Sequence, residues 1–230
     1  MGLTMSRNSA VAAPRRSRPE RRRRIPARKP AVDELANVPR KLPIRRLVVA
    51  CSGGIGAALL PAWGAWLRAT YGLELRFALT RAAAELVSPR ALSAIAGAPT
   101  IVDGRDRGAI PAHLRLARFG EALVIAPATA NLVAKLACGI ADDLVSTLAL
   151  CFAGPTVVVP GLPPGAIGKP SVQRNLARLR RDGFHVAPLA VGPSAASGEG
   201  GLGAMLDLPA FVRFLASACG DASDRVGEPR

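Results

Sequence analysis

Hydrophobic residues along this chain form short continuous runs, and the stretches between them have helical spacing. The continuous runs predict strands over residues 47–51, 73–80, 121–128, 154–161 and 184–191, with a short extended piece at 99–104. Helices are expected over 55–71, 81–97 with a break near Pro89, 131–150, 171–183 and 208–218. Continuous apolar strands that alternate with helices are typical of a parallel sheet covered on both faces. We therefore predict an α/β fold with a Rossmann-like (flavodoxin-like), doubly wound parallel sheet in three layers.

Three turns of small or polar residues follow predicted strands. They are Ser52-Gly53-Gly54, Thr80 and Pro127–Asn131. The carboxyl ends of parallel strands lie at one edge of the sheet, where ligands of such folds bind. Glycines there let backbone N–H groups approach a phosphate, although many α/β proteins have glycine turns without a ligand. The third turn holds nothing large or charged, which favours a flat ligand lying against it.

The positive charge is concentrated near the amino-terminal end. Residues 1–46 hold 14 Lys and Arg against 3 Asp and Glu, whereas residues 47–230 hold 17 against 13. The Arg/Pro-rich stretch 14–30 has almost no large apolar residues, so we predict a disordered tail over 1–43. A folded domain over 44–218 and a short tail over 219–230 would follow. The basic tail fits a solvated linker, a docking segment for an acidic partner or a targeting signal. It has no interleaved aromatics, so a nucleic-acid partner is not expected.

The four cysteines limit the class of protein. Cys51, Cys138, Cys151 and Cys219 lie far apart without a Cys-x-x-Cys pair, which argues against a zinc site and a disulfide scaffold. Their number and spacing favour a reducing compartment. Neither a secretory signal nor a membrane-spanning run is evident. We expect a cytoplasmic protein with no metal and no membrane association.

The stretch "APATANLVAKLACGIADDLVST" (126–147) resembles the signature of the flavin-containing cysteine decarboxylases. This family includes phosphopantothenoylcysteine decarboxylases and enzymes that act on the C-terminal cysteine of lanthipeptide-type precursors. Its turn reads Pro-Ala-Ser-Ala-Asn-Thr, so Thr129 is a mild change and Leu132 removes one hydroxyl. "CSGGIGA" (51–57) and "LTRAAAELVSP" (79–89) look like its two flavin-phosphate turns. His113 lies 14 residues before Pro127, the spacing of the family's active-site histidine.

The resemblance implies FMN bound between the subunits of a homotrimer or of a dodecamer of trimers. FMN would oxidise a cysteine thiol to a thioaldehyde, which then loses CO₂ and leaves an enethiol. His113 would be the base or proton shuttle, since histidine exchanges protons near neutral pH. Asn131 would position flavin or substrate. The cofactor-binding residues are expected to be Ser52, Gly53, Gly54, Ile55, Thr80, Pro127, Ala128, Thr129, Ala130, Asn131 and Ser146.

Each of these residues also has a structural interpretation. His113 alone could be an ordinary surface or core histidine, and we take His185 to be structural. Asn131 could be a helix N-cap as well as a site residue. Asp142 and Asp143 would ordinarily form a solvated helix face, and the resemblance adds a flavin or subunit contact for one of them.

Two segments depart from the family pattern. At 160–167, "PGLPPGAI" replaces Pro-x-Met-Asn-x-x-Met-Trp, so Pro163 stands where an asparagine would bind substrate, and proline offers no donor. Ser197 replaces a cysteine with which phosphopantothenoylcysteine decarboxylases help reduce the enethiol. The glycine-rich stretch 195–205 is either a substrate flap or a plain loop. Substrate contacts are expected from Pro160, Leu162, Pro163, Ser197 and Gly198.

Both departures point away from coenzyme A biosynthesis, and the second, at Ser197, points toward peptide modification. We predict FMN-dependent oxidative decarboxylation of the C-terminal cysteine of a ribosomally synthesised precursor peptide, which gives an aminoenethiol for ring formation. Partners would be that peptide, further copies of the chain and other modification enzymes. Two alternatives stay open: a phosphopantothenoylcysteine decarboxylase, and a non-catalytic flavin-binding regulatory protein.

Overall fold

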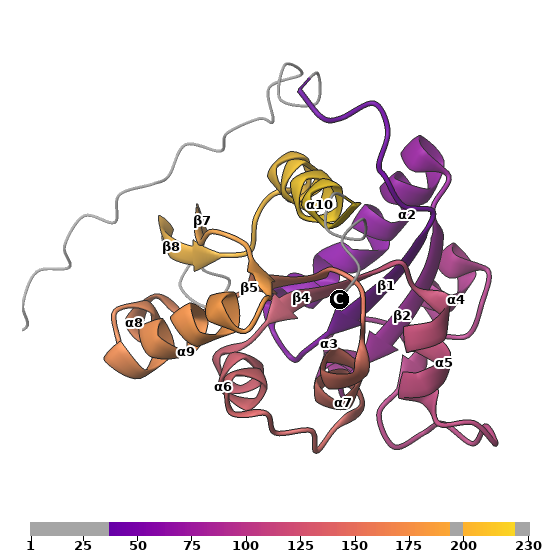
Figure 1. Cartoon of the computed structure of the whole chain (residues 1–230), viewed down its shortest axis with the longest axis horizontal. Coiled ribbons are helices and arrows are strands. Elements are labelled where there is room, and N and C mark those ends of the chain that lie inside the picture. Colours follow the sequence, from indigo (N-terminus) through magenta and orange to yellow (C-terminus); the bar gives the residue numbers. More distant parts are fainter. Residues whose placement is uncertain (1–36, 194–199, 224–230) are drawn as a thin grey trace, which may run out of the picture.

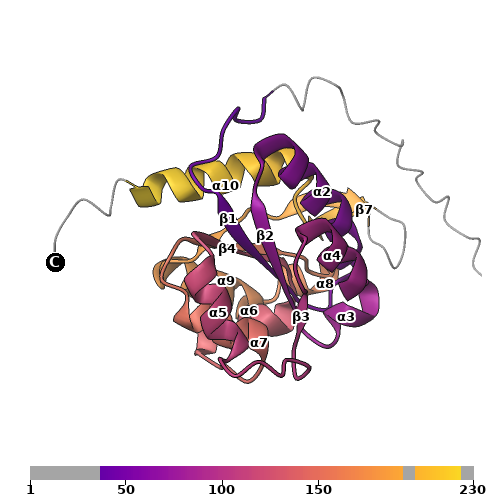
Figure 2. The ribbon, with the colours of Figure 1, turned by 90° about the vertical axis from the view of Figure 1, so that its right-hand side faces the viewer.

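The computed structural model describes residues 37–193 and 200–223, and these form a central parallel sheet between two layers of helices (Figures 1 and 2). The strand order is β3-β2-β1-β4-β5-β6. This order confirms the predicted doubly wound, Rossmann-like sheet, and it differs from the 2-1-3-4-5 order of flavodoxin-like folds. The strands are β1 (Arg46–Cys51), β2 (Glu74–Leu79), β3 (Ile101–Val102), β4 (Ala122–Ala128), β5 (Thr156–Pro160) and β6 (His185–Val186).

Alternate side chains of the strands enter two separate cores. Leu47 and Val49 of β1 face one core, and Val48 and Ala50 face the other. The first core is covered by α2 (Leu60–Tyr71), α4 (Pro89–Ala96) and α10 (Leu208–Ser223). The second core is covered by α5 (Ala112–Phe119), α6 (Ala130–Cys138), α7 (Leu144–Cys151) and α9 (Pro170–Arg181). Burial on both faces explains why the strands read as unbroken apolar runs.

Shorter elements lie beside the sheet. They are η1 (Ile55–Leu59), α3 (Ala83–Leu86), α8 (Pro164–Ile167) and a separate antiparallel hairpin of β7 (Ala190–Pro193) and β8 (Gly200–Ala204). Strand β8 contacts α8, and the hairpin stands apart from the main sheet in Figure 1.

Two predicted elements are wrong in detail. The single helix expected over 131–150 is two helices, because Gly139 ends α6 with a left-handed φ of 69° and Asp143 caps the start of α7. The strand expected over 184–191 contributes only β6 to the sheet, and the chain beyond Pro188 turns into the hairpin. Helix α5, which carries His113, has no counterpart among the predicted helices. Helix α10 runs past residue 218 to Ser223.

Candidate functional site

Ser52 joins the ends of β1 and β4. Its hydroxyl donates to the Pro127 carbonyl at 2.8 Å and accepts from the Thr129 N–H at 3.0 Å. The Ser52 N–H also donates to the Pro127 oxygen at 3.2 Å. A buried hydroxyl is costly unless it is paired, and this one has protein partners for both of its roles. Ser52 therefore contributes to the site by fixing the relative position of two turns.

The glycines after Ser52 leave no room for side chains. A Cβ at Gly53 would lie 2.6 Å from the Cβ of Ala82, and one at Gly54 would lie 3.1 Å from Cγ of Pro127. The Thr80 N–H donates to the Cys51 carbonyl at 3.0 Å, which ties the end of β2 to the same turn. The three predicted turns thus pack together at the carboxyl edge, as the sequence indicates.

This edge retains unpaired hydrogen-bond donors. Among the described residues, the N–H groups of Gly53 and Ile55 have no hydrogen-bond partner. The Thr80 hydroxyl accepts from the Ala83 N–H at 3.2 Å, which leaves its own proton to be donated elsewhere. Such donors beside the start of a helix suit a phosphate group.

Thr129, and not Asn131, caps the helix that follows β4. The Thr129 hydroxyl accepts from the Leu132 N–H at 3.4 Å, and Asn131 is the second residue of α6. The N-cap interpretation of Asn131 is therefore wrong. Its exposed amide has no hydrogen-bond partner within the described ranges, so it is available to a ligand.

The segment after β5 links this edge to the hairpin. The Gly161 N–H donates to the Ala128 carbonyl at 3.0 Å, and the Leu162 N–H donates to the Gly203 carbonyl at 2.9 Å. A Cβ at Gly203, where φ is 122°, would overlap the Leu162 carbonyl oxygen. Pro160 and Leu162 are buried and Pro163 is exposed. The segment 160–167, which departs from the family pattern, thus packs against β8. Ser197 and Gly198 lie outside the described residues.

His113 is the second residue of α5 and is half-buried. Because α5 leads back into β4, its first turn lies toward the carboxyl edge of the sheet. None of the described hydrogen bonds joins His113 to Asn131 or to the Ser52 turn. His185 lies in the edge strand β6.

Ser146 belongs to a different local arrangement. The Asp143 carboxylate accepts from the Ser146 N–H at 2.8 Å, and the Ser146 hydroxyl accepts from the Asp143 N–H at 3.2 Å, which makes a capping box. Ser146 is buried, and no described hydrogen bond brings it to the glycine turn. Its predicted contact with the cofactor remains a prediction, and its described hydrogen bonds serve the start of α7.

The two aspartates pair with a lysine that the sequence did not single out. Lys135 Nζ lies 2.7 Å from Asp142 and 2.9 Å from Asp143. Burial pushes the pKa of Asp143 up, but hydrogen bonds from Ser146 and Lys135 outweigh it, and the net pKa lies below its ordinary value. These charges brace the turn between α6 and α7.

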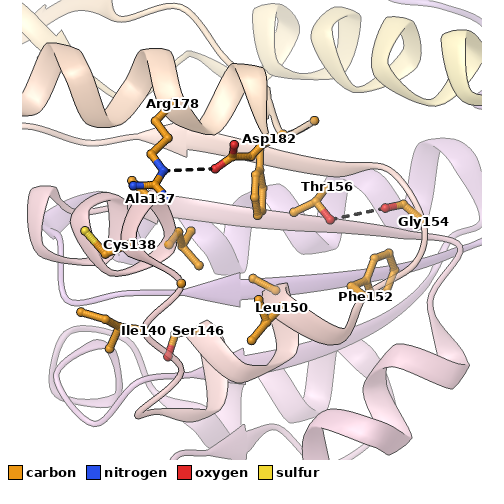
Figure 3. A pocket seen from close by; sticks show the side chains of 15 residues that line it. Ala137, Cys138, Ile140, Ser146, Leu150, Phe152, Gly154, Thr156, Arg178 and Asp182 are labelled. Atoms are coloured by element: carbon orange, nitrogen blue, oxygen red, sulfur yellow. Dashed lines mark hydrogen bonds and ion pairs between the residues drawn. The ribbon is translucent and has the colours of Figure 1, made fainter.

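A cavity of about 460 Å³ lies between α6, α7 and the end of α9 (Figure 3). Ile140 and Leu150 line it and are 47% and 65% exposed, and Arg178 and Asp182 form an ion pair of 3.6 Å at its rim. Its lining includes Thr156 at the start of β5, so this cavity lies at the end of the sheet opposite the glycine turn.

Two of the four cysteines, Cys51 and Cys219, are buried. Burial raises the pKa of Cys51 to about 12 and that of Cys219 to about 11, which keeps both thiols protonated. Within the described ranges, no group of His, Cys, Asp and Glu side chains could hold a metal ion. No described helix combines the length and apolar character that a membrane crossing requires.

A family model described as "Flavoprotein" matches residues 35–220, most of the chain. The chain belongs to this flavoprotein family. The crystal structure of the FMN-dependent cysteine decarboxylase SpaF is 36% identical, with a TM-score of 0.64, and the match covers 77% of this chain and 98% of that one. The FMN-dependent cysteine decarboxylase TvaF, from thioviridamide biosynthesis, is 33% identical with a TM-score of 0.59, over 62% of this chain and 89% of that one.

Curated relatives carry the same family signal. The coenzyme A biosynthesis bifunctional protein CoaBC of Escherichia coli is 36% identical over 168 residues, which are 71% of this chain and 40% of that protein. The chain thus spans about 40% of the length of that relative. The resemblance to flavin-dependent cysteine decarboxylases is confirmed, and these relatives comprise both branches of the family.

The carboxyl edge fits a flavin mononucleotide on its own geometry. A phosphate needs several donors, and the Gly53 and Ile55 N–H groups and the Thr80 hydroxyl are available. A flat ring needs a wall without bulk, and the turn from Pro127 to Ala130 holds no large or charged side chain. Gly53 and Gly54 let Ala82 and Pro127 pack closely against the first turn. The residues present therefore suit the cofactor for which the family is known.

Proposed function

We propose that this protein catalyses FMN-dependent oxidative decarboxylation of the C-terminal cysteine of a ribosomally synthesised peptide. The observation that carries the proposal is the 36% identity to SpaF, an FMN-dependent cysteine decarboxylase, over 98% of its length. Ser197 supports the same choice of substrate, because its hydroxyl does not replace the cysteine with which phosphopantothenoylcysteine decarboxylases help reduce the enethiol.

The chain's own residues would hold the cofactor at the carboxyl edge. The Gly53 and Ile55 N–H groups and the Thr80 hydroxyl would bind its phosphate. The turn from Pro127 to Ala130 would lie against its ring, and the Asn131 amide would bond to its edge or to the substrate. FMN, when bound, supplies a two-electron oxidant for the cysteine thiol.

His113 would carry the proton transfers. Oxidation of a thiol requires loss of its proton, and an imidazole exchanges protons near neutral pH. The substrate's cysteine would reach this histidine between the Asn131 amide and the base of the hairpin. The hairpin of β7 and β8 would close over the peptide. Gly203 of this hairpin accepts a hydrogen bond from Leu162, and Leu162 lies in the segment after β5 that adjoins the proposed FMN site.

We further propose a homo-oligomer, a trimer or a dodecamer of trimers. Ile55, Leu59 and Leu86 are 60%, 49% and 39% exposed, and they flank the glycine turn on two adjacent elements. Exposed apolar side chains next to a ligand site favour cover by another protein surface. Light scattering of the FMN-loaded protein would give the number of copies, and a monomer would contradict this proposal.

Phosphopantothenoylcysteine decarboxylase is the second candidate, and the match to CoaBC favours it. Pro163 and Ser197 speak against it, since neither offers the group expected there. A third candidate is a flavin-binding regulatory protein without catalysis, which the altered segment at 160–167 favours and the retained His113 disfavours.

One experiment separates the three candidates. FMN-loaded protein is incubated with peptides that end in cysteine and, in parallel, with phosphopantothenoylcysteine, and the CO₂ released is measured. Release from the peptides alone supports the proposed function. Release from phosphopantothenoylcysteine alone supports the second candidate. Release from neither, by protein that retains FMN, supports the third.

A further inference from the structure

The described part of the chain holds another cavity, of about 530 Å³, at the outer edge of the sheet. It lies between the edge strand β3, the loop that follows β3, and helix α5. Its lining shares no residue with the glycine turn or with the turns after β2 and β4. Its volume is in the range of sites for small molecules.

Positive charge dominates the lining of this cavity. Four of the lining residues are arginines: Arg76, Arg105, Arg107 and Arg115. Asp106, the one lining carboxylate, already bonds to Arg115 at 2.7 and 3.1 Å. Hydrogen bonds from Arg115 hold the pKa of Asp106 below its ordinary value, so that pair stays ionised and neutral overall. The other three arginines form no ion pair with any described residue, which leaves an excess of positive charge.

Thr100 adds an unpaired donor to the same cavity. Its hydroxyl is the one buried side-chain polar atom without a hydrogen-bond partner among the described residues. The Thr100 N–H, by contrast, is paired with the Ser93 hydroxyl at 2.9 Å. A buried unpaired hydroxyl costs about 1–3 kcal/mol. Its oxygen is covered from solvent, so a ligand that accepts its proton, and thereby recovers that cost, would bind with the Thr100 side chain rotated toward the cavity. This second observation is independent of the arginines.

The cavity also has an apolar side. The Arg76 guanidinium lies 4.4 Å from the centre of the Phe119 ring and donates to the Leu75 carbonyl at 2.9 Å. These contacts fix the orientation of the guanidinium, which lowers the entropy lost when it binds an anion. Leu116 and Ile101 complete a hydrophobic wall next to it.

We propose that this cavity binds a small organic anion, namely a phosphate monoester or a carboxylate carried on an apolar body. Arg105 and Arg107 would receive the oxygens of the head group in charge-assisted hydrogen bonds. The Thr100 hydroxyl would donate a further bond, and the apolar body would pack on Phe119 and Leu116. This site is independent of the decarboxylation proposed above.

Calorimetric titration of the full chain, saturated with FMN so that the cofactor's own phosphate site is filled, tests the proposal. The probes are phenyl phosphate and benzoate, at constant ionic strength. Saturable binding of one of them is expected. The double variant Arg105→Gln/Arg107→Gln should weaken it by roughly tenfold or more. Thr100→Val should weaken it by about fivefold without lowering Tm, because the hydroxyl it removes is unpaired.

The matched control is Arg90→Gln/Arg174→Gln, which removes two exposed arginines on α4 and α9 and the same net charge. Binding of phenyl phosphate alone identifies a phosphate ligand, and binding of benzoate alone identifies a carboxylate. The proposal is overturned if neither binds, if Arg105→Gln/Arg107→Gln leaves affinity unchanged, or if the control weakens it equally. Binding of polyglutamate without either small anion would also overturn it, and would indicate a polypeptide surface.

Discussion

At the residue scale, the position of Gly53 requires a residue without a side chain. It lies next to Ser52, whose hydroxyl is taken up in joining two strands, and its own absent side chain lets Ala82 approach. A Cβ there would lie 2.6 Å from that of Ala82, so the second turn would be displaced from the first. Gly53→Ala should therefore weaken FMN binding by roughly tenfold or more, because the donors of both turns would separate.

Fluorescence titration of the apoprotein with FMN measures this effect. The double variant Gly53→Ala/Ala82→Gly removes the colliding Cβ and should restore most of the affinity. Gly165→Ala is the matched control, since a Cβ at Gly165 meets nothing within 4 Å. Wild-type affinity in Gly53→Ala would show that the contact between the turns does not shape the site.

His113 is expected to act in the chemistry and not in the fold. It is half-buried, and none of the described side-chain hydrogen bonds involves it. His113→Asn should retain FMN and Tm while the rate of CO₂ release falls by roughly 10²–10⁴-fold, the usual contribution of a general acid or base. His185→Asn, in the edge strand β6, should keep the rate. A His113→Asn protein that turns over normally would remove histidine from the mechanism.

At the element scale, the capping box of α7 links Asp143 to folding. Its pKa lies below the ordinary carboxylate value, so its contribution to stability is present above about pH 4 and is lost as pH falls through the folded-state pKa. Asp143→Ala should lower the free energy of unfolding at pH 7 by about 0.5–2 kcal/mol, the range for a lost N-cap.

Urea unfolding at several pH values checks this prediction, and the difference between wild type and variant should narrow in acid. Asp182→Asn is the control, because its pair with Arg178 is exposed at both ends and such pairs contribute less than about 1 kcal/mol. A difference that is constant with pH would show that the carboxylate's charge is not the stabilising element.

The hairpin depends on one glycine. Gly203 has a φ of 122° and its carbonyl accepts from the Leu162 N–H at 2.9 Å. Gly203→Ala should detach β8 from the segment after β5, and KM for a peptide should rise about tenfold while FMN affinity is kept. Gly201→Ala meets only Pro164 side-chain atoms at 3.4 Å or more and serves as its control. Equal KM values in both variants would separate the hairpin from substrate binding.

Predictions of helices from hydrophobic periodicity, and of caps from turn residues, fail at different points along the chain. Apolar runs identified the buried strands because each is covered on both faces. The apolar pattern could not show that the helix predicted over 131–150 is interrupted. The break depends on the left-handed conformation of Gly139 and on the cap that Asp143 provides. Both residues also fit a continuous helix face. The apolar pattern missed α5 because its mixed arginine and leucine pattern lies after a loop with no strong cap. The N-cap of α6 is Thr129 and not Asn131, because the Thr129 hydroxyl lies within hydrogen-bonding distance of the Leu132 N–H.

At the scale of the whole molecule, the sequence pattern predicted the ligand-binding carboxyl edge of the sheet but not the cavity beside β3. Ser52, Thr80 and Pro127 meet because parallel strands place their carboxyl ends together, which residue order alone implies. The cavity with Thr100 and Arg105 could not be predicted, because it depends on how the segment 99–119 folds back on itself and lies beside Arg76 of β2. Its arginines look like ordinary surface charge until the fold gathers them.

The mass of the product tests most directly whether this protein oxidatively decarboxylates a C-terminal cysteine with FMN. FMN-loaded protein is incubated with a peptide that ends in cysteine, and the peptide is analysed by high-resolution mass spectrometry. Loss of CO₂ together with two hydrogens, about 46 Da, is the predicted result, because oxidation precedes release of the carboxyl group. Loss of about 44 Da would mean decarboxylation without net oxidation, and an unchanged mass with FMN bound would mean that peptides are not substrates. Either result would contradict the account.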